Sequence, residues 1–91
     1  MNNLPLNCAI LKCFTIYDKP LCAEDIMEVL KDDYGDFRMF RKKEVMSVLM
    51  TGVVNGFLQE DRYELDKNGE AIIWYIANQE GKDTINNYLP D

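Results

Sequence analysis

The sequence predicts a single, mainly helical domain with one small β-hairpin. Three stretches carry apolar residues at three- and four-residue steps, the spacing that gives a helix one apolar face. A segment of alternating character, 57–65, separates them from a fourth apolar stretch. With 91 residues, 47% of them hydrophobic, the chain can build one core. We therefore expect residues 1–91 to form a three-helix core, a short hairpin and a C-terminal helix, with 82–91 as a partly frayed tail.

The first helix is predicted over about 5–16. Leu6, Ile10 and Phe14 recur on one face. Proline suits a first helical turn, where its missing N–H costs nothing, and position 5 is Pro. The Asp-Lys-Pro sequence at 18–20 then predicts a turn, because Pro presets one dihedral angle and biases the preceding residue away from helix. The chain should reverse direction there.

The second helix is predicted over about 23–32. Ile26 and Leu30 fall on its inner face, and Glu24 lies in the first turn, where the helix dipole favours an anion. Four turn-forming residues within 32–36 should end it.

The third helix is predicted over about 40–55. Val45 and Leu49 lie on its apolar face, and Asn55-Gly56 is a typical left-handed stop. The next residues, FLQEDRYEL, predict a short hairpin that turns around Glu60-Asp61.

The fourth helix is predicted over about 67–79, with Asp66 as its cap. Its apolar residues, Ala71 to Ala77, cover more than one face of such a helix. Gly81 should break it.

Positive charge gathers at the start of the third helix, although the net charge of the chain is −6. Cations are disfavoured at a helix N-terminus by about 0.3 to 1 kcal/mol each, so this placement favours a functional use over a stabilising one. The alternative is that the cluster forms a solvated face and neutralises the acidic residues of 32–36. The cluster consists of Arg38, Arg41, Lys42 and Lys43.

Several classes of function find no support in the sequence. There is no His, which removes Ser-His and Cys-His catalysis, and Cys8, Cys13 and Cys22 lack zinc-site spacing and are expected to be buried thiols. No phosphate loop or metal motif is present. We expect no enzyme, no cofactor and no metal site. The longest apolar run is far shorter than the roughly 20 residues of a membrane span, and the N-terminal stretch is unlike a secretory signal, so we expect a cytoplasmic protein.

The order of elements and the local sequence resemble the winged helix-turn-helix superfamily of small bacterial or phage-type regulators. PLCAEDIMEVL resembles the start of its second helix, and EVMSVLMTGVVNGFLQEDRYELDKNGEAII resembles its third helix, its wing and the entry to its last helix. The resemblance covers about 6–78. It implies a regulator that binds duplex DNA with the N-terminal half of its third helix. Its DNA contacts would be Arg38, Arg41, Lys42 and Lys43, with Arg62 on the wing.

A homodimer is expected, because one copy with few phosphate contacts would bind DNA weakly. Apolar surface on the predicted fourth helix, at Ile73, Trp74 and Ile76, is the candidate dimer interface, although Trp74 could instead close the core over the first helix.

A second hypothesis keeps the fold but assigns it another role. The predicted hairpin tip, Gln59-Glu60-Asp61, is acidic and should be repelled by phosphate. The protein would then be an adaptor or inhibitor whose acidic surface binds a basic protein partner and does not bind DNA.

Overall fold

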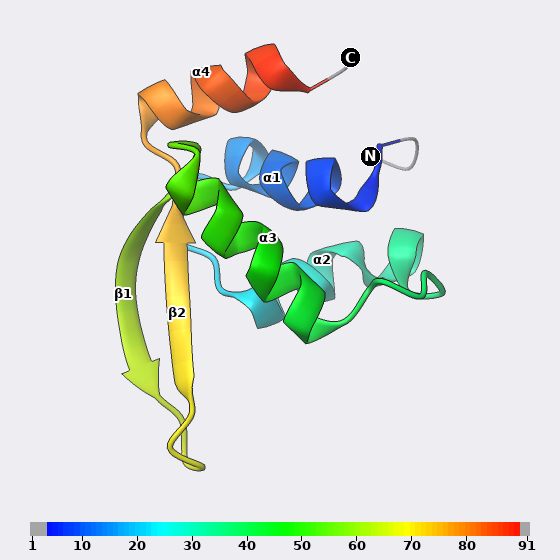
Figure 1. Cartoon of the computed structure of the whole chain (residues 1–91), viewed down its shortest axis with the longest axis vertical. Helices are drawn as coiled ribbons and strands as arrows, with labels where there is room; N and C mark the ends of the chain where they lie inside the picture. Colours follow the sequence, from blue (N-terminus) through cyan, green and yellow to red (C-terminus); the bar gives the residue numbers. More distant parts are fainter. Residues whose placement is uncertain (1–3, 90–91) are drawn as a thin grey trace.

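The computed structural model describes residues 4–89 of the chain. Three helices form the core, a two-stranded antiparallel hairpin stands beside them, and a fourth helix follows the hairpin (Figure 1). The elements are α1 (Leu6–Ile16), α2 (Ala23–Tyr34), α3 (Lys42–Val54), β1 (Gln59–Leu65), β2 (Ala71–Ile76) and α4 (Gln79–Tyr88).

The three core helices confirm the predicted periodicity, and their bounds differ from the predicted ones by no more than two residues. Ile10 and Phe14 of α1, Ile26 of α2, and Val45 and Leu49 of α3 are all buried in one cluster. The apolar stripe on each helix is therefore what draws the three together.

The hairpin turn lies between β1 and β2 at residues 66–70, so the prediction of a turn at Glu60-Asp61 is wrong. Asp66 Oδ1 accepts backbone N–H bonds from Asn68 at 2.8 Å and from Glu70 at 2.9 Å. Gly69 has a φ of 80°, which favours glycine. Asp66 therefore does cap backbone donors as predicted, but those donors belong to a turn rather than to a helix. Glu60-Asp61 lies inside β1, where the pairing register shifts.

Residues 71–76 form β2, so the prediction of a helix over 67–79 is wrong. The segment is rich in Ile and aromatic residues, which favour strands. Tyr75 is buried and exchanges two backbone hydrogen bonds with Leu21, at 2.8 and 2.9 Å. A continuous apolar run with no single face is typical of a strand that is covered on both faces. Here the bridge to the α1–α2 connection holds one face of β2 against the core.

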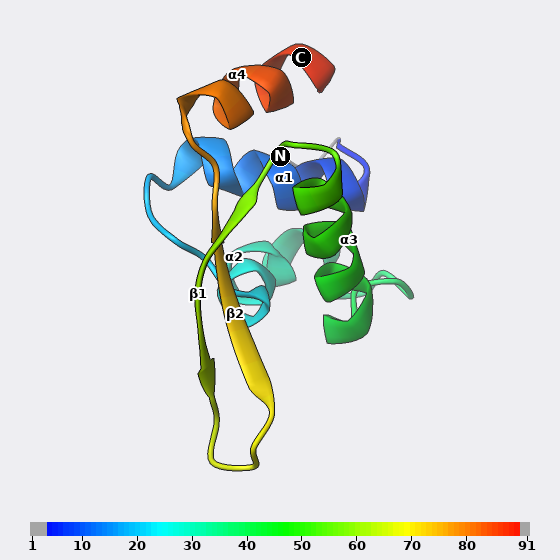
Figure 2. The same ribbon diagram turned by 60° about the vertical axis from the view of Figure 1, so that its left-hand side comes forward.

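Helix α4 includes residues 82–88, which were expected to belong to a partly frayed tail; residues 90 and 91 of that predicted tail lie outside the described part of the chain. Ile85 and Leu89 are buried, and α4 lies beside α1, at the end of the molecule away from the hairpin turn (Figures 1 and 2). Gly81 does not break a helix. It lies in the first turn of α4, where Asn78 Oδ1 accepts its N–H at 2.8 Å and where a Cβ would meet the Phe57 carbonyl oxygen.

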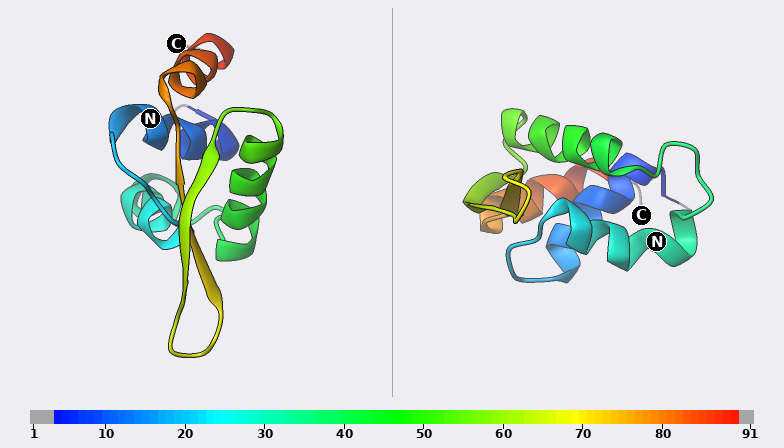
Figure 3. Two further views of the ribbon diagram at one scale, coloured as in Figure 1. Left: turned by 90° about the vertical axis from the view of Figure 1, so that its left-hand side faces the viewer. Right: turned by 90° about the horizontal axis from the view of Figure 1, so that it is seen from below.

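The hairpin extends beyond the helices. It runs alongside α3, and its outer face is not covered by any helix within residues 4–89 (Figure 3). The hairpin and α3 together form the two sides of an open surface.

Candidate functional site

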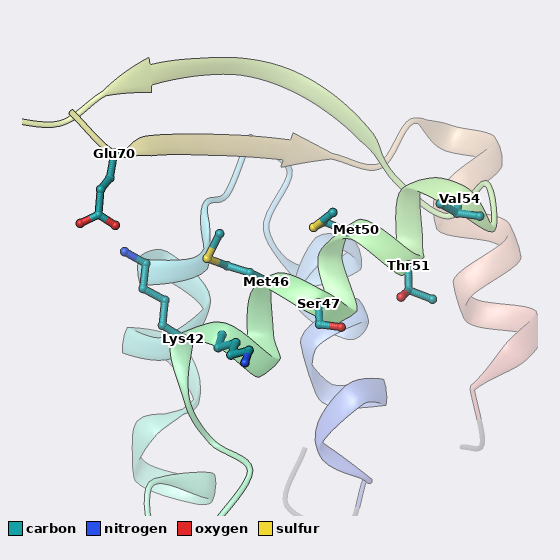
Figure 4. Close-up of a pocket in the computed structure, with 8 residues that line it drawn as sticks. Lys42, Met46, Ser47, Met50, Thr51, Val54 and Glu70 are labelled. Carbon is teal, nitrogen blue, oxygen red and sulfur yellow. The ribbon is translucent and has the colours of Figure 1, made fainter. Parts of the chain in front are cut away.

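A groove of about 720 Å³ lies between α3 and the hairpin turn. Met46 and Met50 project from α3 toward the hairpin, and Glu70 lies across from Lys42 at one end (Figure 4). Its lining residues are Lys42, Lys43, Met46, Ser47, Met50, Thr51, Val54 and Glu70.

One side of α3 is buried and the other is open. Val45, Leu49 and Gly52 face the core. The opposite side exposes residues at steps of three or four, which places them in one row along the helix. The row consists of Lys43, Ser47, Met50, Thr51 and Val54, and we call it the outer row of α3.

The four predicted cations are placed differently: Lys42 and Lys43 lie in the first turn of α3 and line the groove, Arg41 directly precedes the helix, and Arg38 lies in the turn before it. Lys42 Nζ lies 2.8 Å from Glu24 Oε2, and Arg41 lies 3.8 Å from Glu44. Arg38, in the turn before α3, and Lys43 are exposed and form no ion pair with any of residues 4–89. Lys43 is therefore the cation of α3 most ready to meet an anion.

The ion pair between α2 and α3 changes both charged groups. The hydrogen bond from Lys42 lowers the pKa of the Glu24 carboxyl below its ordinary value. The same hydrogen bond raises the pKa of Lys42, with smaller contributions from the charges of Glu70 and Asp66. Lys42 is thus paired with Glu24 of α2, and Glu70 of the hairpin turn lies across from it.

Arg62 lies apart from the other predicted cations. Its guanidinium stacks 4.1 Å from the centre of the Trp74 ring and pairs with Glu64. Arg62 pairs with Trp74 across the hairpin, so both project from one face, whereas Ile73 projects from the other face and packs against the core. Arg62 therefore projects from the face turned away from α3.

The hairpin is acidic, as the sequence predicts, but its tip differs. Residues 59–76 carry five carboxylates and two cations. The tip is Asp66 to Glu70, with Lys67 exposed within the turn. Lys67 was not recognised as a candidate contact, because the turn was placed at the other end of β1.

The predicted dimer residues lie on β2, not on a helix. Ile73 packs against the core. Trp74 is half-buried and is absent from the core cluster, so it does not close the core over α1. Trp74 and Ile76 share the outer face of the hairpin.

Sequence reasoning missed the middle of α3 as a candidate surface. Ser47, Met50, Thr51 and Val54 carry no charge, and they lie in a segment that resembles the third helix of the superfamily without having been assigned a role. The signal was available, because Met50 and Val54 fall outside the apolar stripe formed by Val45 and Leu49. An apolar side chain that lies outside the buried stripe is exposed to solvent and does not stabilise the core, so it marks a candidate contact surface.

The prediction of buried thiols is confirmed for two of the three cysteines. Cys13 and Cys22 are buried and Cys8 is half-buried, and burial raises the pKa of the Cys13 thiol to about 11. Within residues 4–89, no three Cys, Asp or Glu side chains are grouped so that they could hold a metal ion. No helix in this part of the chain has the length and apolar character needed to cross a membrane.

Comparisons with known proteins identify the architecture. No protein-family model matches the sequence, and no curated protein sequence matches it. Among solved structures, the chain is similar to PadR of Bacillus subtilis, determined in complex with operator DNA, with a TM-score of 0.68 at 20% identity. The match covers 91% of this chain and 46% of the PadR chain, so this protein spans about half the length of PadR. The order of helices and hairpin and this match together show that the chain has a PadR-like winged-helix fold.

Proposed function

We propose that this protein is a transcription regulator that binds duplex DNA with α3. The observation that carries the proposal is the outer row of α3. This side of the helix is exposed, has cations at its N-terminal end and does not pack against the core. The structural similarity to PadR, which was solved on operator DNA, supports the same use of the fold.

The contacts follow from the geometry of the groove. Lys43 is free to meet a phosphate or a guanine, with Arg41 directly before the first residue of the helix and Arg38 in the preceding turn. Lys42 contributes less, because Glu24 holds it. Arg62 is left out of this contact set, since it projects from the opposite hairpin face.

The net charge of −6 does not prevent such binding. At physiological salt the Debye length is roughly 8 Å, so carboxylates on the far side of the molecule are weakly felt at α3. Few phosphate contacts imply a modest salt dependence, with a slope of about −0.9 per contact in log K against log salt.

We propose that the protein is a homodimer. A single copy makes few phosphate contacts and would bind DNA weakly, whereas a dimer doubles the number of contacts. Trp74 and Ile76 are the candidate contacts, because they lie on the outer face of the hairpin, whereas Ile73 already packs in the core. Sedimentation of the Trp74→Ser protein against the natural one tests this interface.

A fluorescence-anisotropy titration with mixed-sequence duplex DNA, at low and at moderate salt, tests DNA binding. We expect binding that weakens with salt and falls at least several-fold in an Arg41→Ala, Lys43→Ala double variant. A Lys31→Ala, Lys19→Ala double variant removes the same charge away from α3 and should bind almost normally. The absence of binding at low salt, or equal binding by the two double variants, contradicts the proposal.

The acidic hairpin supports one alternative, a winged-helix adaptor or inhibitor that binds a basic protein. Its five carboxylates oppose DNA at the wing. Two results together would favour this alternative. The anisotropy titration would show no DNA binding, and a single stoichiometric protein partner would copurify with the natural protein but not with a Glu60→Gln, Glu64→Gln variant.

A further inference from the structure

The composition of α3 is unusual for a helix that reads bases. Bidentate recognition of guanine uses Arg or Lys, and bidentate recognition of adenine uses Asn or Gln. Helix α3, KKEVMSVLMTGVV, contains no Arg, Asn or Gln, and its only cations are the two lysines of its first turn. Beyond that turn, α3 can form no bidentate pair with a purine.

The outer row of α3 offers apolar groups instead. Met50 is 59% exposed and Val54 is 84% exposed, in a helix whose buried side is already filled by Val45 and Leu49. Exposed apolar side chains contribute nothing to the core. Thr51 lies between them on the groove surface and adds a further methyl group.

Apolar side chains in a major groove have one specific partner, the 5-methyl group of thymine. Resting on the proposed function, we propose that Met50, Thr51 and Val54 read thymine methyl groups, so that each half-site places thymines opposite the C-terminal half of α3. Ser47 hydrogen-bonds to base edges without strong preference, and Lys43 sets the position of the helix on the backbone.

The spacing along α3 defines the size of this reading unit. At 1.5 Å per residue, Lys43 and Val54 lie about 16 Å apart along the helix axis. Met50 and Val54 are about 6 Å apart on the same scale, so they should contact the methyl groups of two different thymines.

The experiment begins with duplexes selected by the natural protein from a random pool. Each thymine of a selected half-site is then replaced by uracil, which removes one methyl group and leaves every hydrogen-bonding group in place. Burying one methyl-sized group is worth about 0.8 kcal/mol, or about fourfold in affinity. We expect such a loss at two or more positions of a half-site.

Variants assign the effect to α3. In Met50→Ala and Val54→Ala, the thymine and uracil duplexes should bind with nearly equal affinity at the position concerned. Met39→Ala, which truncates a comparably exposed Met in the turn before α3, should keep the full discrimination. All three side chains are exposed, and circular dichroism checks that each variant is folded.

The outcomes separate this inference from the proposed function. If the selected duplexes bind and uracil substitution has no effect at any position, or if Met50→Ala and Val54→Ala keep the discrimination, the thymine inference is wrong and DNA binding stands. If no duplex is bound even at low salt, the proposed function fails and the inference fails with it.

Discussion

Glu24 and Lys42 form an ion pair between the first turns of α2 and α3, with Glu24 Oε2 2.8 Å from Lys42 Nζ. This contact joins two adjacent core helices. It also neutralises Lys42, one of the four cations that the sequence analysis predicts to contact DNA. The surface of α3 is therefore less basic than the run of residues 38–43 indicates. Both side chains are about half exposed, so the pair contributes little to stability, on the order of 0 to 1 kcal/mol.

Removing the partner of Lys42 should strengthen DNA binding. Glu24→Gln frees the ammonium group to contact phosphate, so we expect affinity to rise several-fold at low salt and the salt slope to steepen by about 0.9. Anisotropy titrations over a range of salt concentrations measure both quantities. Glu28→Gln removes the same charge from α2, where Glu28 pairs with Lys31, and should change binding less. Equal effects of the two variants would show that only net charge matters.

Glu70 should oppose DNA directly, because it lines the groove across from Lys42 (Figure 4). We expect Glu70→Gln to raise the affinity for duplex DNA by a few-fold. Glu80→Gln, with the same change of charge on α4, serves as the control in the same titration. A Glu70→Gln protein that binds no better than the control would place the DNA outside this end of the groove.

The two cations of the hairpin should differ in their effect on DNA binding. Lys67 is exposed in the turn, whereas Arg62 is stacked on Trp74 and paired with Glu64. We expect Lys67→Ala to weaken binding more than Arg62→Ala. Arg62→Ala should instead alter the fluorescence of Trp74, the single tryptophan of the chain. A larger binding loss for Arg62→Ala would mean that the outer face of the hairpin contacts DNA.

The attachment of α4 to the turn after α1 should depend on pH. Lys82 Nζ lies 2.6 Å from Asp18 Oδ1, and its hydrogen bond and charge lower the pKa of the Asp18 carboxyl. A carboxyl whose pKa is lower in the folded state than in the unfolded state stabilises the fold at pH values above its unfolded pKa, which is near 3.8 for Asp18. This stabilisation is lost as the pH falls through the lower pKa of the folded state. Thermal melts of Asp18→Asn should show a small loss of stability at pH 7 that vanishes in strong acid.

Asp32→Asn controls for the loss of one carboxylate in that experiment, because Asp32 is exposed at the far end of α2. Its melting temperature should not fall at pH 7. A difference between Asp18→Asn and the natural protein that persists unchanged in acid would exclude the ion pair as the cause.

Gly81 should be required for the docking of α4. A Cβ at this position would lie 2.4 Å from the Phe57 carbonyl oxygen, so α4 must shift to admit it. We expect Gly81→Ala to lower the free energy of unfolding by about 1 to 3 kcal/mol, as overpacking does. Urea denaturation measures the change. Asn87→Ala, an exposed change in the same helix, should have little effect, and equal stability of both variants would contradict the close contact.

The first half of the fold was predictable because its information is local. Helical periodicity, turn residues and caps act over a few positions, and they placed α1, α2 and α3 to within two residues. The second half was not predictable in the same way. Asp66 was predicted to cap a helix and instead closes the hairpin turn, because an Asp accepts backbone N–H bonds in either setting and only its partners distinguish the two.

The sequence by itself determined that the chain forms one helical core followed by a hairpin, and that four of its ten cations lie at or just before the start of the third helix. The composition of residues 71–76 favours a strand, and tertiary structure decided the outcome, because the hydrogen bonds between Tyr75 and Leu21 join positions far apart in the chain. It also decided which cations are free, since the partner of Lys42 lies on another helix. Such contacts form between segments that are far apart in the chain, so local sequence patterns cannot predict them.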